Sequence, residues 1–465
     1  MKLVLLSGGS GKRLWPLSND VRSKQFLKML HAPNGERESM VQRIWRQLEA
    51  NQLTDDVFIS TTNSQGDLIQ SQLGANVRMI IEAESRDTFP SIALAATYLY
   101  SKIGAELSEV ITVMPVDPYV EEEFFSKIKQ LEDAINQSGS DLALIGVTPT
   151  YPSTKYGYII PLKEEGQKQS QPYQKVHSFK EKPTEEQAQK LLEHHALWNC
   201  GVFAFRLGYL IDLLEEKGLP SQYDKLTEQY GNLPKISFDY EVVEKAGHVV
   251  VIPYERDWKD LGTWNTLTEE MDVNLMGRGF LSEDCANTHV INELDLPVAV
   301  IGVTDMVIAV SPDGILVSDK AKSHLVKNLM KDMDQRPMYE ERRWGWYHVL
   351  DYQKMYEKEE VLTKKLHIYA GKNLSYQYHR KRSEVWVIVD GEGEFVLNDQ
   401  LSLVGPGDVL QIPVGAKHGI KAIKDIEIIE VQMGSELQEE DIIRLFMSWD
   451  EMKAFLNRNG KGGSL

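Results

Sequence analysis

The sequence predicts an α/β protein in which a doubly wound, mostly parallel sheet precedes a short β connector and a C-terminal antiparallel barrel. Over the first 270 residues, apolar strand-like runs alternate with helix-like stretches, a pattern typical of a parallel sheet with helices on both faces. Short strand-like runs without helices follow, and then dense short strands with turn residues indicate an antiparallel barrel. We expect domains at 1–270, 271–335 and 336–465, with the polar run 331–343 as a linker.

The composition is that of a soluble enzyme and not of a nucleic-acid or membrane binder. Of the 465 residues, 42% are hydrophobic and 26% charged, which is ordinary for globular domains. The net charge of −18 argues against nucleic acid and acidic membranes as partners. Cys200 and Cys285 are too few for a disulfide framework, and no apolar run approaches the roughly 18 residues of a membrane span. We therefore expect a cytoplasmic enzyme that concentrates its positive charge locally.

Individual elements of the first domain follow from apolar length and spacing. Strands are expected where short aliphatic runs occur, and helices where apolar residues recur at helical spacing. The expected strands are 57–60, 77–81, 110–114 and 142–147, and the expected helices are 91–103 and 122–135. Ligands of such sheets bind beyond the carboxyl ends of the strands, so the loops at that edge should hold the site.

The chain opens on a buried-strand pattern, Leu3–Leu6, followed at once by a glycine-rich turn. Glycines permit positive φ and let a ligand approach the backbone; here they are Gly8, Gly9 and Gly11. Successive N–H groups of such a turn form a concavity for anions. Full positive charges can be added there by Lys12, Arg13 and Lys24. The spacing is neither that of a P-loop nor that of the dinucleotide-binding G-x-G-x-x-G motif.

This opening stretch, continued through Ser23–Leu27, resembles the signature of sugar-1-phosphate nucleotidyltransferases, and most closely that of mannose-1-phosphate guanylyltransferases. Lys12 and Ser23 stand where that family usually has Thr and Pro. Further family elements follow in order along the first domain, at 84–90, 113–117, 154–159, 179–183, 198–203, 239–241 and 258–264. Four positions depart from the family pattern: Asp87 replaces Asn, Phe89 replaces Ala, Pro118 replaces His and Cys200, expected to be structural, replaces Ser.

The resemblance implies roles for particular residues. Nucleotide binding is implied for Leu6, Gly8, Gly9, Gly11, Arg86 and Thr88, and catalysis for Arg13, Lys24 and Lys182. Sugar binding is implied for Gly157, Glu181 and Asn199. Asp117 and Asp260 would share Mg²⁺, a hard cation that keeps coordination positions for water and phosphate. Taken singly, these motifs also permit structural interpretations: helix caps for Asp87 and Thr88, a turn former for Asp117, and solvated surface for Glu181 with Lys182.

Two stretches of the predicted barrel, Gly371–Gly391 and Gly407–His418, resemble the cupin signatures. The candidate metal ligands are Gln377, His379, Glu384 and His418. Strand alternation places Gln377 and His379 on one face, and the other two would come from neighbouring strands. Two imidazoles, a carboxylate and an amide oxygen could bind a divalent cation such as Zn²⁺, Co²⁺, Mn²⁺, Fe²⁺ or Ni²⁺.

The barrel also resembles the type II phosphomannose isomerase half of bifunctional enzymes. The matching residues are Gln377, His379, Arg382, Glu384 and Trp386. However, Gly419 stands where the family has an Arg expected to engage the sugar phosphate or assist proton transfer. Isomerisation needs a base beside C2 and a cation that stabilises the enediolate. We therefore expect the metal site of the isomerase pattern to be retained and its contact with the sugar phosphate to be lost.

The expected function is formation of GDP-mannose and pyrophosphate from GTP and α-D-mannose 1-phosphate, with Mg²⁺ as cofactor. One alternative is another nucleotide or another hexose 1-phosphate, since no base-reading contact follows from these residues. A second alternative is a bifunctional enzyme whose barrel interconverts mannose 6-phosphate and fructose 6-phosphate. In a third, the barrel serves dimerisation or ligand sensing. A homo-oligomer is expected in each case.

Overall fold

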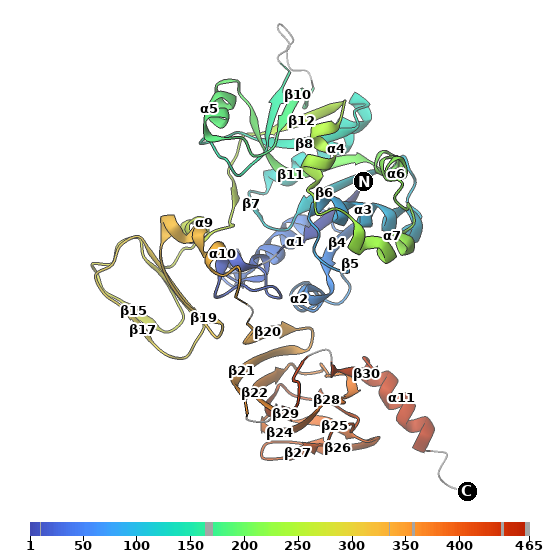
Figure 1. Ribbon diagram of the computed structural model, residues 1–465, viewed down its shortest axis with the longest axis vertical. Coiled ribbons are helices and arrows are strands. Elements are labelled where there is room, and N and C mark those ends of the chain that lie inside the picture. The colour runs from blue at the N-terminus through green and yellow to red at the C-terminus, as the bar shows by residue number, and fades with distance from the viewer. Residues whose placement is uncertain (10, 163–170, 334, 356–358, 439–440, 461–465) are drawn as a thin grey trace.

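The chain forms three regions that follow one another in sequence and lie at different places along an elongated molecule (Figure 1). The structure is a computed structural model that describes residues 1–465 except 10, 163–170, 334, 356–358, 439–440 and 461–465. An α/β region carries the N-terminus, a small β region lies at its side, and a strand-rich region with the C-terminal helix lies at the far end.

The first region is built on a sheet whose nine described strands have the order β5-β4-β1-β6-β11-β8-β12-β10-β9. Their bounds are β1 (Lys2–Ser7), β4 (Val57–Thr62), β5 (Met79–Glu82), β6 (Val110–Pro115), β8 (Leu142–Val147), β9 (Tyr158–Pro161), β10 (Gln174–Lys180), β11 (Leu197–Arg206) and β12 (Val249–Tyr254). Of these nine strands, β10 and β11 run against the other seven. The predicted mostly parallel sheet is confirmed.

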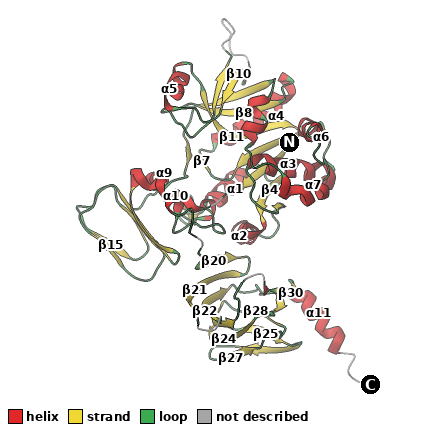
Figure 2. Cartoon of the chain, in the orientation of Figure 1, coloured by secondary structure: helices red, strands yellow, loops and turns green. Residues whose placement is uncertain are grey.

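Helices cover both faces of this sheet (Figure 2). One buried cluster joins the sheet to α1 (Met40–Ala50), α2 (Asn63–Leu73) and α4 (Glu123–Ser138). The other joins it to α3 (Thr88–Tyr98), α6 (Leu207–Glu216) and α7 (Tyr223–Gln229). The helix predicted at 91–103 begins earlier, at Thr88, and its last five residues form a wider π-helical turn. Smaller elements are β2 (Leu30–His31), β3 (Arg37–Glu38), α5 (Glu185–Glu193) and α8 (Phe238–Glu241).

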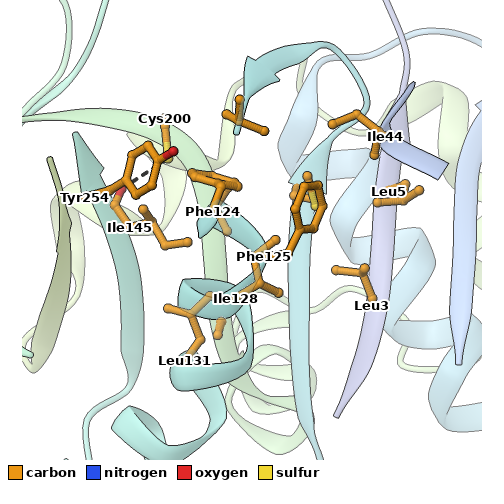
Figure 3. Packing of buried hydrophobic residues seen from close by; sticks show 14 of the residues in the cluster. Leu3, Leu5, Ile44, Phe124, Phe125, Ile128, Leu131, Ile145, Cys200 and Tyr254 are labelled. Atoms are coloured by element: carbon orange, nitrogen blue, oxygen red, sulfur yellow. Dashed lines mark hydrogen bonds between the residues drawn. The ribbon is translucent and has the colours of Figure 1, made fainter. Parts of the chain in front are cut away.

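Aromatic packing fixes α4 on the sheet (Figure 3). Phe124 and Phe125 are fully buried, and the Phe124 ring meets Tyr254 of β12 edge-on with centroids 5.1 Å apart. Each such ring contributes about 2 kcal/mol by leaving water. Beside them, the Cys200 thiol of β11 donates to the carbonyl of Ile145 at 3.3 Å, and burial raises the pKa of this thiol to about 12. Cys200 therefore belongs to the core, as expected from the sequence.

The connector packs short strands against the opening segment of the chain. Its strands are β14 (Leu275–Met276), β15 (Gly279–Leu281), β16 (His289–Asn292), β17 (Val298–Val300), β18 (Met306–Ser311) and β19 (Gly314–Asp319). They follow α9 (Trp264–Glu269) and lead into a 3-10 turn, η6 (Lys320–Leu325), and the short helix α10 (Val326–Leu329). Arg22 donates two hydrogen bonds to the Glu293 carboxylate, and Asn19 donates to Asp313 at 2.8 Å.

The last region is the predicted antiparallel barrel, made of a six-stranded and a five-stranded sheet. Its elements are β20 (Tyr339–Arg342), β21 (Gly345–Lys354), β22 (Glu360–Ile368), β23 (Tyr376–Tyr378), β24 (Arg382–Asp390), β25 (Gly393–Leu397), β26 (Gln400–Val404), β27 (Val409–Ile412), β28 (His418–Ala422), β29 (Ile426–Gly434), β30 (Ile443–Phe446) and helix α11 (Trp449–Gly460). No helix in the described part of the chain is both long and apolar enough to cross a membrane.

The prediction that 331–343 is only a linker was wrong in part. Residues Tyr339–Arg342 form β20, which pairs with β21 and extends the barrel sheet. The charged side chains that suggested a linker are paired within the fold, since Arg342 forms ion pairs with Glu340 and with Asp67 of α2.

Candidate active site

A cavity of about 450 Å³ opens beyond the carboxyl ends of β1 and β6, where the sheet topology predicts a ligand site. Residues from several distant segments line it: Gly8, Gly9, Gly11, Arg13, Ser23, Lys24, Gln25, Pro115, Asp117, Pro118, Tyr156, Asn199, Cys200, Trp258, Asp260 and Lys327. Eight of the site residues implied by the family resemblance thus share one cavity.

The glycine turn is packed against the following segment at Gly11 and is open at Gly8 and Gly9. A Cβ on Gly11 would collide with the carbonyl oxygen of Asn19 and come within 2.8 Å of Ser23 Cα. Ser23 donates its hydroxyl hydrogen to the Gly9 carbonyl at 3.0 Å. By contrast, no described atom lies within 4 Å of a Cβ placed on Gly8 or Gly9. Close packing therefore requires glycine at position 11, whereas positions 8 and 9 face open space that a ligand can enter.

Lys24 lies between the two aspartates that the family resemblance associates with Mg²⁺. Its Nζ is 2.8 Å from Asp117 Oδ2 and 2.8 Å from Asp260 Oδ1. Burial opposes the ammonium charge, but the two carboxylates outweigh it and raise the pKa of Lys24. Burial likewise opposes the charge of Asp260, and Lys24 still holds the pKa of that carboxyl below its usual value. The pair of carboxylates is a site that attracts a cation.

A small ladder explains why two aspartates so distant in sequence meet. Strand β7 (Pro118–Val120) pairs with β13 (Trp258–Asp260), and Asp260 lies opposite Pro118. Asp117, immediately before β7, is therefore brought beside Asp260. A Cβ on Gly262 would come within 2.9 Å of Asp260 Oδ1, so the chain turns tightly behind that carboxylate.

Gly157, Glu181 and Asn199 lie together, and of these three only Asn199 lines the cavity. A Cβ on Gly157 would collide with Glu181 Oε2 and come within 2.7 Å of Phe179 Cζ. The Asn199 backbone N–H donates to the Gly157 carbonyl at 2.8 Å, and its side-chain oxygen accepts from Gly201 N at 3.1 Å. Glu181 Oε2 is buried without a hydrogen-bond partner among the described residues. A buried carboxylate oxygen in this state is an acceptor ready for a hydroxyl group.

Asp239 and Lys182 complete this polar group. Asn199 donates from Nδ2 to Asp239 Oδ1 at 2.6 Å, and Lys182 Nζ lies 2.7 Å from Glu181 Oε1. Burial, reinforced by the nearby Glu181 charge, raises the pKa of Asp239 to about 6. Lys182 adopts a positive φ of 42°, a conformation that is uncommon for lysine, and its side chain turns back to Glu181.

Arg86 and Thr88 do not line the cavity. Their described hydrogen bonds and ion pairs are with other residues of the same domain. Arg86 donates to the Leu233 carbonyl at 2.6 Å and forms an ion pair with Glu84 at 2.9 Å. Thr88 accepts a hydrogen bond from Phe238 N, while the Asp87 carboxylate caps the helix by accepting from Thr88 N. Leu6 lies in β1 and accepts from Val116 N through its carbonyl, directly before the glycine turn.

In the barrel, His379, Glu384 and His418 gather their ligand atoms within 4.8 Å of one another, and all three are buried. Glu384 Oε1 is 3.1 Å from His379 Nε2, and Glu384 Oε2 is 3.4 Å from His418 Nε2. The other ring nitrogen of each histidine faces a backbone carbonyl, of Asp441 for His379 and of Ala416 for His418. Both Nδ1 atoms therefore donate to the backbone, and both Nε2 atoms face the carboxylate.

This arrangement fits a cation. His418 Nε2 is buried without a hydrogen-bond partner in the described part of the chain, and it lies 3.4 Å from a carboxylate oxygen of Glu384. Arg382 supplies part of the positive charge at this site, since it donates to Glu384 Oε1 at 2.9 Å and lies 3.5 Å from His379 Nε2. The fourth candidate ligand, Gln377, lies opposite His418 on β23, but its side-chain oxygen accepts from Ser375 at 2.6 Å.

Gly419, the main departure from the isomerase pattern, lies where two strands approach closely. A Cβ there would come within 3.1 Å of the Ser375 carbonyl oxygen and 3.2 Å of Tyr376 Cα. A side chain at position 419 would therefore require the facing backbone to shift by a few tenths of an ångström.

Two family models match the chain. The model described as nucleotidyl transferase matches residues 2–275, which is more than half of the sequence. The chain belongs to the nucleotidyl transferase family. The model described as mannose-6-phosphate isomerase C-terminal matches residues 331–446. This nucleotidyltransferase is therefore an enzyme with a second, isomerase-like region, and its substrates are a nucleotide and a sugar phosphate.

Relatives of the nucleotidyltransferase match along nearly its whole length. Mannose-1-phosphate guanylyltransferase 2 of Escherichia coli O157:H7 is 30% identical, over 95% of this chain and 96% of its own. The alginate biosynthesis protein AlgA of Pseudomonas aeruginosa is 28% identical, over 95% of each chain. A crystal structure described as mannose-1-phosphate geranyltransferase from Thermus thermophilus matches with a TM-score of 0.60 and 27% identity, over 72% of this chain and 99% of that one.

The cavity of this nucleotidyltransferase also contains residues that were not singled out from the sequence. Tyr156 and Trp258 form an aromatic wall, with ring centroids 5.3 Å apart. Both lie inside motifs that carry the family resemblance, at 154–159 and 258–264, and the sequence does not indicate where their side chains point. Lys327 comes from the connector, in a polar run without a motif, and only the tertiary structure brings it to the cavity.

Proposed function

We propose that the cavity at the glycine turn is where this member of the guanylyltransferase family forms GDP-mannose and pyrophosphate from GTP and α-D-mannose 1-phosphate. The observation that carries the proposal is the pair Asp117 and Asp260, which face one cation beside an open glycine turn. Backbone N–H groups and cations at one end, and hydroxyl acceptors at the other, suit a triphosphate and a sugar.

In the proposed reaction, a phosphate oxygen of mannose 1-phosphate attacks the α-phosphorus of GTP in line. The new O–P bond forms as the bond from the α-phosphorus to the bridging oxygen breaks, and pyrophosphate carries away the electron pair. The protein contributes position and charge neutralisation more than covalent chemistry. Arg13, Lys24 and the amides of Gly8–Gly11 stabilise the departing pyrophosphate.

Mg²⁺ fits the two carboxylates because they already hold a cationic group, the Lys24 ammonium, between them. In the proposal Asp117 and Asp260 hold the ion, and Lys24 turns toward the phosphates. When bound, Mg²⁺ neutralises phosphate charge in the transition state. Use of divalent metal is shared by families of this kind, whereas the identity of the ion is our proposal.

The sugar phosphate is placed by the polar group at β9–β11. Glu181 Oε2 accepts from a sugar hydroxyl, and this contact satisfies its missing hydrogen bond. Asn199, locked by three hydrogen bonds, presents its amide at the cavity. Gly157 lets the Glu181 carboxylate lie against the backbone, and Lys182 neutralises the sugar phosphate.

A product assay with purified full-length protein tests the function. GTP and mannose 1-phosphate should give GDP-mannose and pyrophosphate, EDTA should abolish the reaction, and added Mg²⁺ should restore it. ATP, UTP and dTTP, each with mannose 1-phosphate or glucose 1-phosphate, serve as the specificity panel. Faster turnover with UTP or dTTP would replace the guanylyl assignment with the alternative nucleotide.

For the barrel we propose a divalent cation held by His379, Glu384 and His418, with Gln377 as fourth ligand after leaving Ser375. Metal analysis of the purified protein should show one transition-metal ion per chain, and the variant His418→Ala should lose it. Isomerase activity remains the second candidate, and a coupled assay with fructose 6-phosphate and Zn²⁺ or Co²⁺ decides it. The cytoplasmic location and the homo-oligomer also remain predictions, the latter open to light scattering.

A further inference from the structure

Lys327 brings a positive charge from the connector to the catalytic cavity. It lies on α10, more than 300 residues after the glycine turn in sequence, and it lines the same cavity as Gly8, Arg13 and Lys24. α10 packs against the 3-10 turn Lys12–Leu14, which directly follows the glycines. Figure 1 shows this helix beside the N-terminal segment. Lys327 therefore faces the end of the cavity that the triphosphate would occupy.

The backbone that carries Lys327 is firmly anchored. Val326, the preceding residue, is 3% exposed. The η6 turn before it is capped by the Asp319 carboxylate, which accepts from the backbone of Ala321 and Lys322. Lys320 is buried and donates to Asn287 at 2.7 Å. Such anchoring places the Lys327 side chain at the cavity without a conformational change of its helix.

Two of the neighbouring cations, Lys24 and Lys12, are already engaged, whereas Lys327, like Arg13, is exposed and has no ion pair with a described residue. Lys24 is bound by two carboxylates. Lys12 lies 3.5 Å from Asp20 and 3.4 Å from the Met333 carbonyl. An exposed ammonium beside open backbone N–H groups is suited to binding phosphate oxygens.

We propose that Lys327 binds the β- and γ-phosphates of the nucleotide and hence the pyrophosphate that leaves, so that the connector completes the active site. This inference rests on the proposed function and adds a substrate-binding residue from outside the nucleotidyl-transfer domain. The proposed function assigns the sugar phosphate to a different group of side chains, Lys182 and Glu181, which directly follow β10. Lys327 should therefore affect pyrophosphate and GTP while leaving mannose 1-phosphate unaffected.

Steady-state kinetics of full-length Lys327→Ala test the proposal in both directions of the reaction. We expect the KM for pyrophosphate in the reverse reaction to rise about tenfold, and the KM for GTP to rise similarly. The KM values for mannose 1-phosphate and GDP-mannose should stay within about twofold. Lys327→Arg should restore most of the loss, and Lys322→Ala, an exposed lysine of the same connector segment, should match the wild type.

An unchanged KM for pyrophosphate, or an equal rise for all four substrates, would overturn the proposal. If the wild type does not use GTP and mannose 1-phosphate, the proposed function fails separately. Calorimetric titration with magnesium pyrophosphate then still decides the role of Lys327. Wild-type binding that is lost in Lys327→Ala and kept in Lys322→Ala supports the contact, and equal binding by wild type and Lys327→Ala rejects it.

Discussion

Lys24 is the residue on which the electrostatics of the cavity depend. Its ammonium is 2.8 Å from each of two carboxylates whose mutual repulsion it suppresses. Without another cation, removing one partner of such a buried group leaves uncompensated charge, which is costly. Lys24 can therefore keep the site stable before metal binds and act on phosphate once a metal ion takes over the carboxylates.

The variant Lys24→Met tests this double role. Without divalent metal, we expect it to be destabilised by about 3 kcal/mol, because Asp117 and Asp260 then face each other unneutralised. Mg²⁺ should recover part of this loss and raise the melting temperature more than in the wild type. Thermal unfolding with EDTA and with Mg²⁺ measures both effects, and Lys28→Met serves as an exposed control. An equal response of wild type and variant to Mg²⁺ would contradict the shared site.

Asp239 gives a prediction about pH. Burial raises its pKa from 3.8 to about 6 in the folded protein, so the folded state holds a proton that the unfolded state releases. Between about pH 4 and pH 6 the contribution of this group to stability must therefore fall as pH rises. The variant Asp239→Asn keeps an oxygen that can accept from Asn199, and this fall should be absent in it. Across that range, the change in the free energy of unfolding should differ by about 3 kcal/mol between the two proteins. Urea unfolding at about pH 4 to 7 measures it, and parallel curves for both proteins would refute the assignment.

At the scale of elements, close approach of strands shapes the sugar side of the site. β9 begins directly after Gly157, and the absence of a Cβ there lets Glu181 lie against the backbone. The same principle governs Gly419 in the barrel, where β28 packs tightly on β23. At Gly157 the missing side chain makes room for the Glu181 carboxylate, and at Gly419 it lets two strands approach closely.

Gly157→Ala should displace Glu181 and weaken sugar binding. We expect the KM for mannose 1-phosphate to rise about tenfold or more while the KM for GTP changes little, because the glycine turn is a separate element. Gly66→Ala in α2 is a matched control, since its nearest atoms would lie 3.9 Å away. Unchanged kinetics for mannose 1-phosphate would show that this approach does not position the sugar.

How far the sequence could predict these elements depended on whether the signal was local. Strand runs and motif spacing located β1, the glycine turn and both aspartates, because each is encoded within a few residues. The antiparallel insertion of β11 between β6 and β8, and the ladder that joins Asp117 to Asp260, arise from pairing across the chain. Nothing local marks Lys327 either, because its role depends on where the connector docks. Strand β20 was not predicted because its charged residues, which are paired within the fold, are also typical of a linker.

At the scale of the whole molecule, the three regions meet on the segment just before Lys24. Arg22 binds Glu293 of the connector and lies over the ring of Tyr339 on β20, 5.1 Å from its centroid. Asp313 of the connector accepts from Asn19 and from Met338 N, at the entrance to the barrel. The segment that carries Lys24 is thus in contact with both downstream regions.

The most direct measurement is the rate of GDP-mannose formation by Asp260→Ala at saturating Mg²⁺, beside Asp257→Ala, an exposed aspartate three residues earlier. We expect a fall in kcat of at least about a thousandfold for Asp260→Ala, with unchanged far-ultraviolet circular dichroism, and wild-type rates for Asp257→Ala. A rate for Asp260→Ala within a few-fold of the wild type would contradict a cation shared by the two carboxylates.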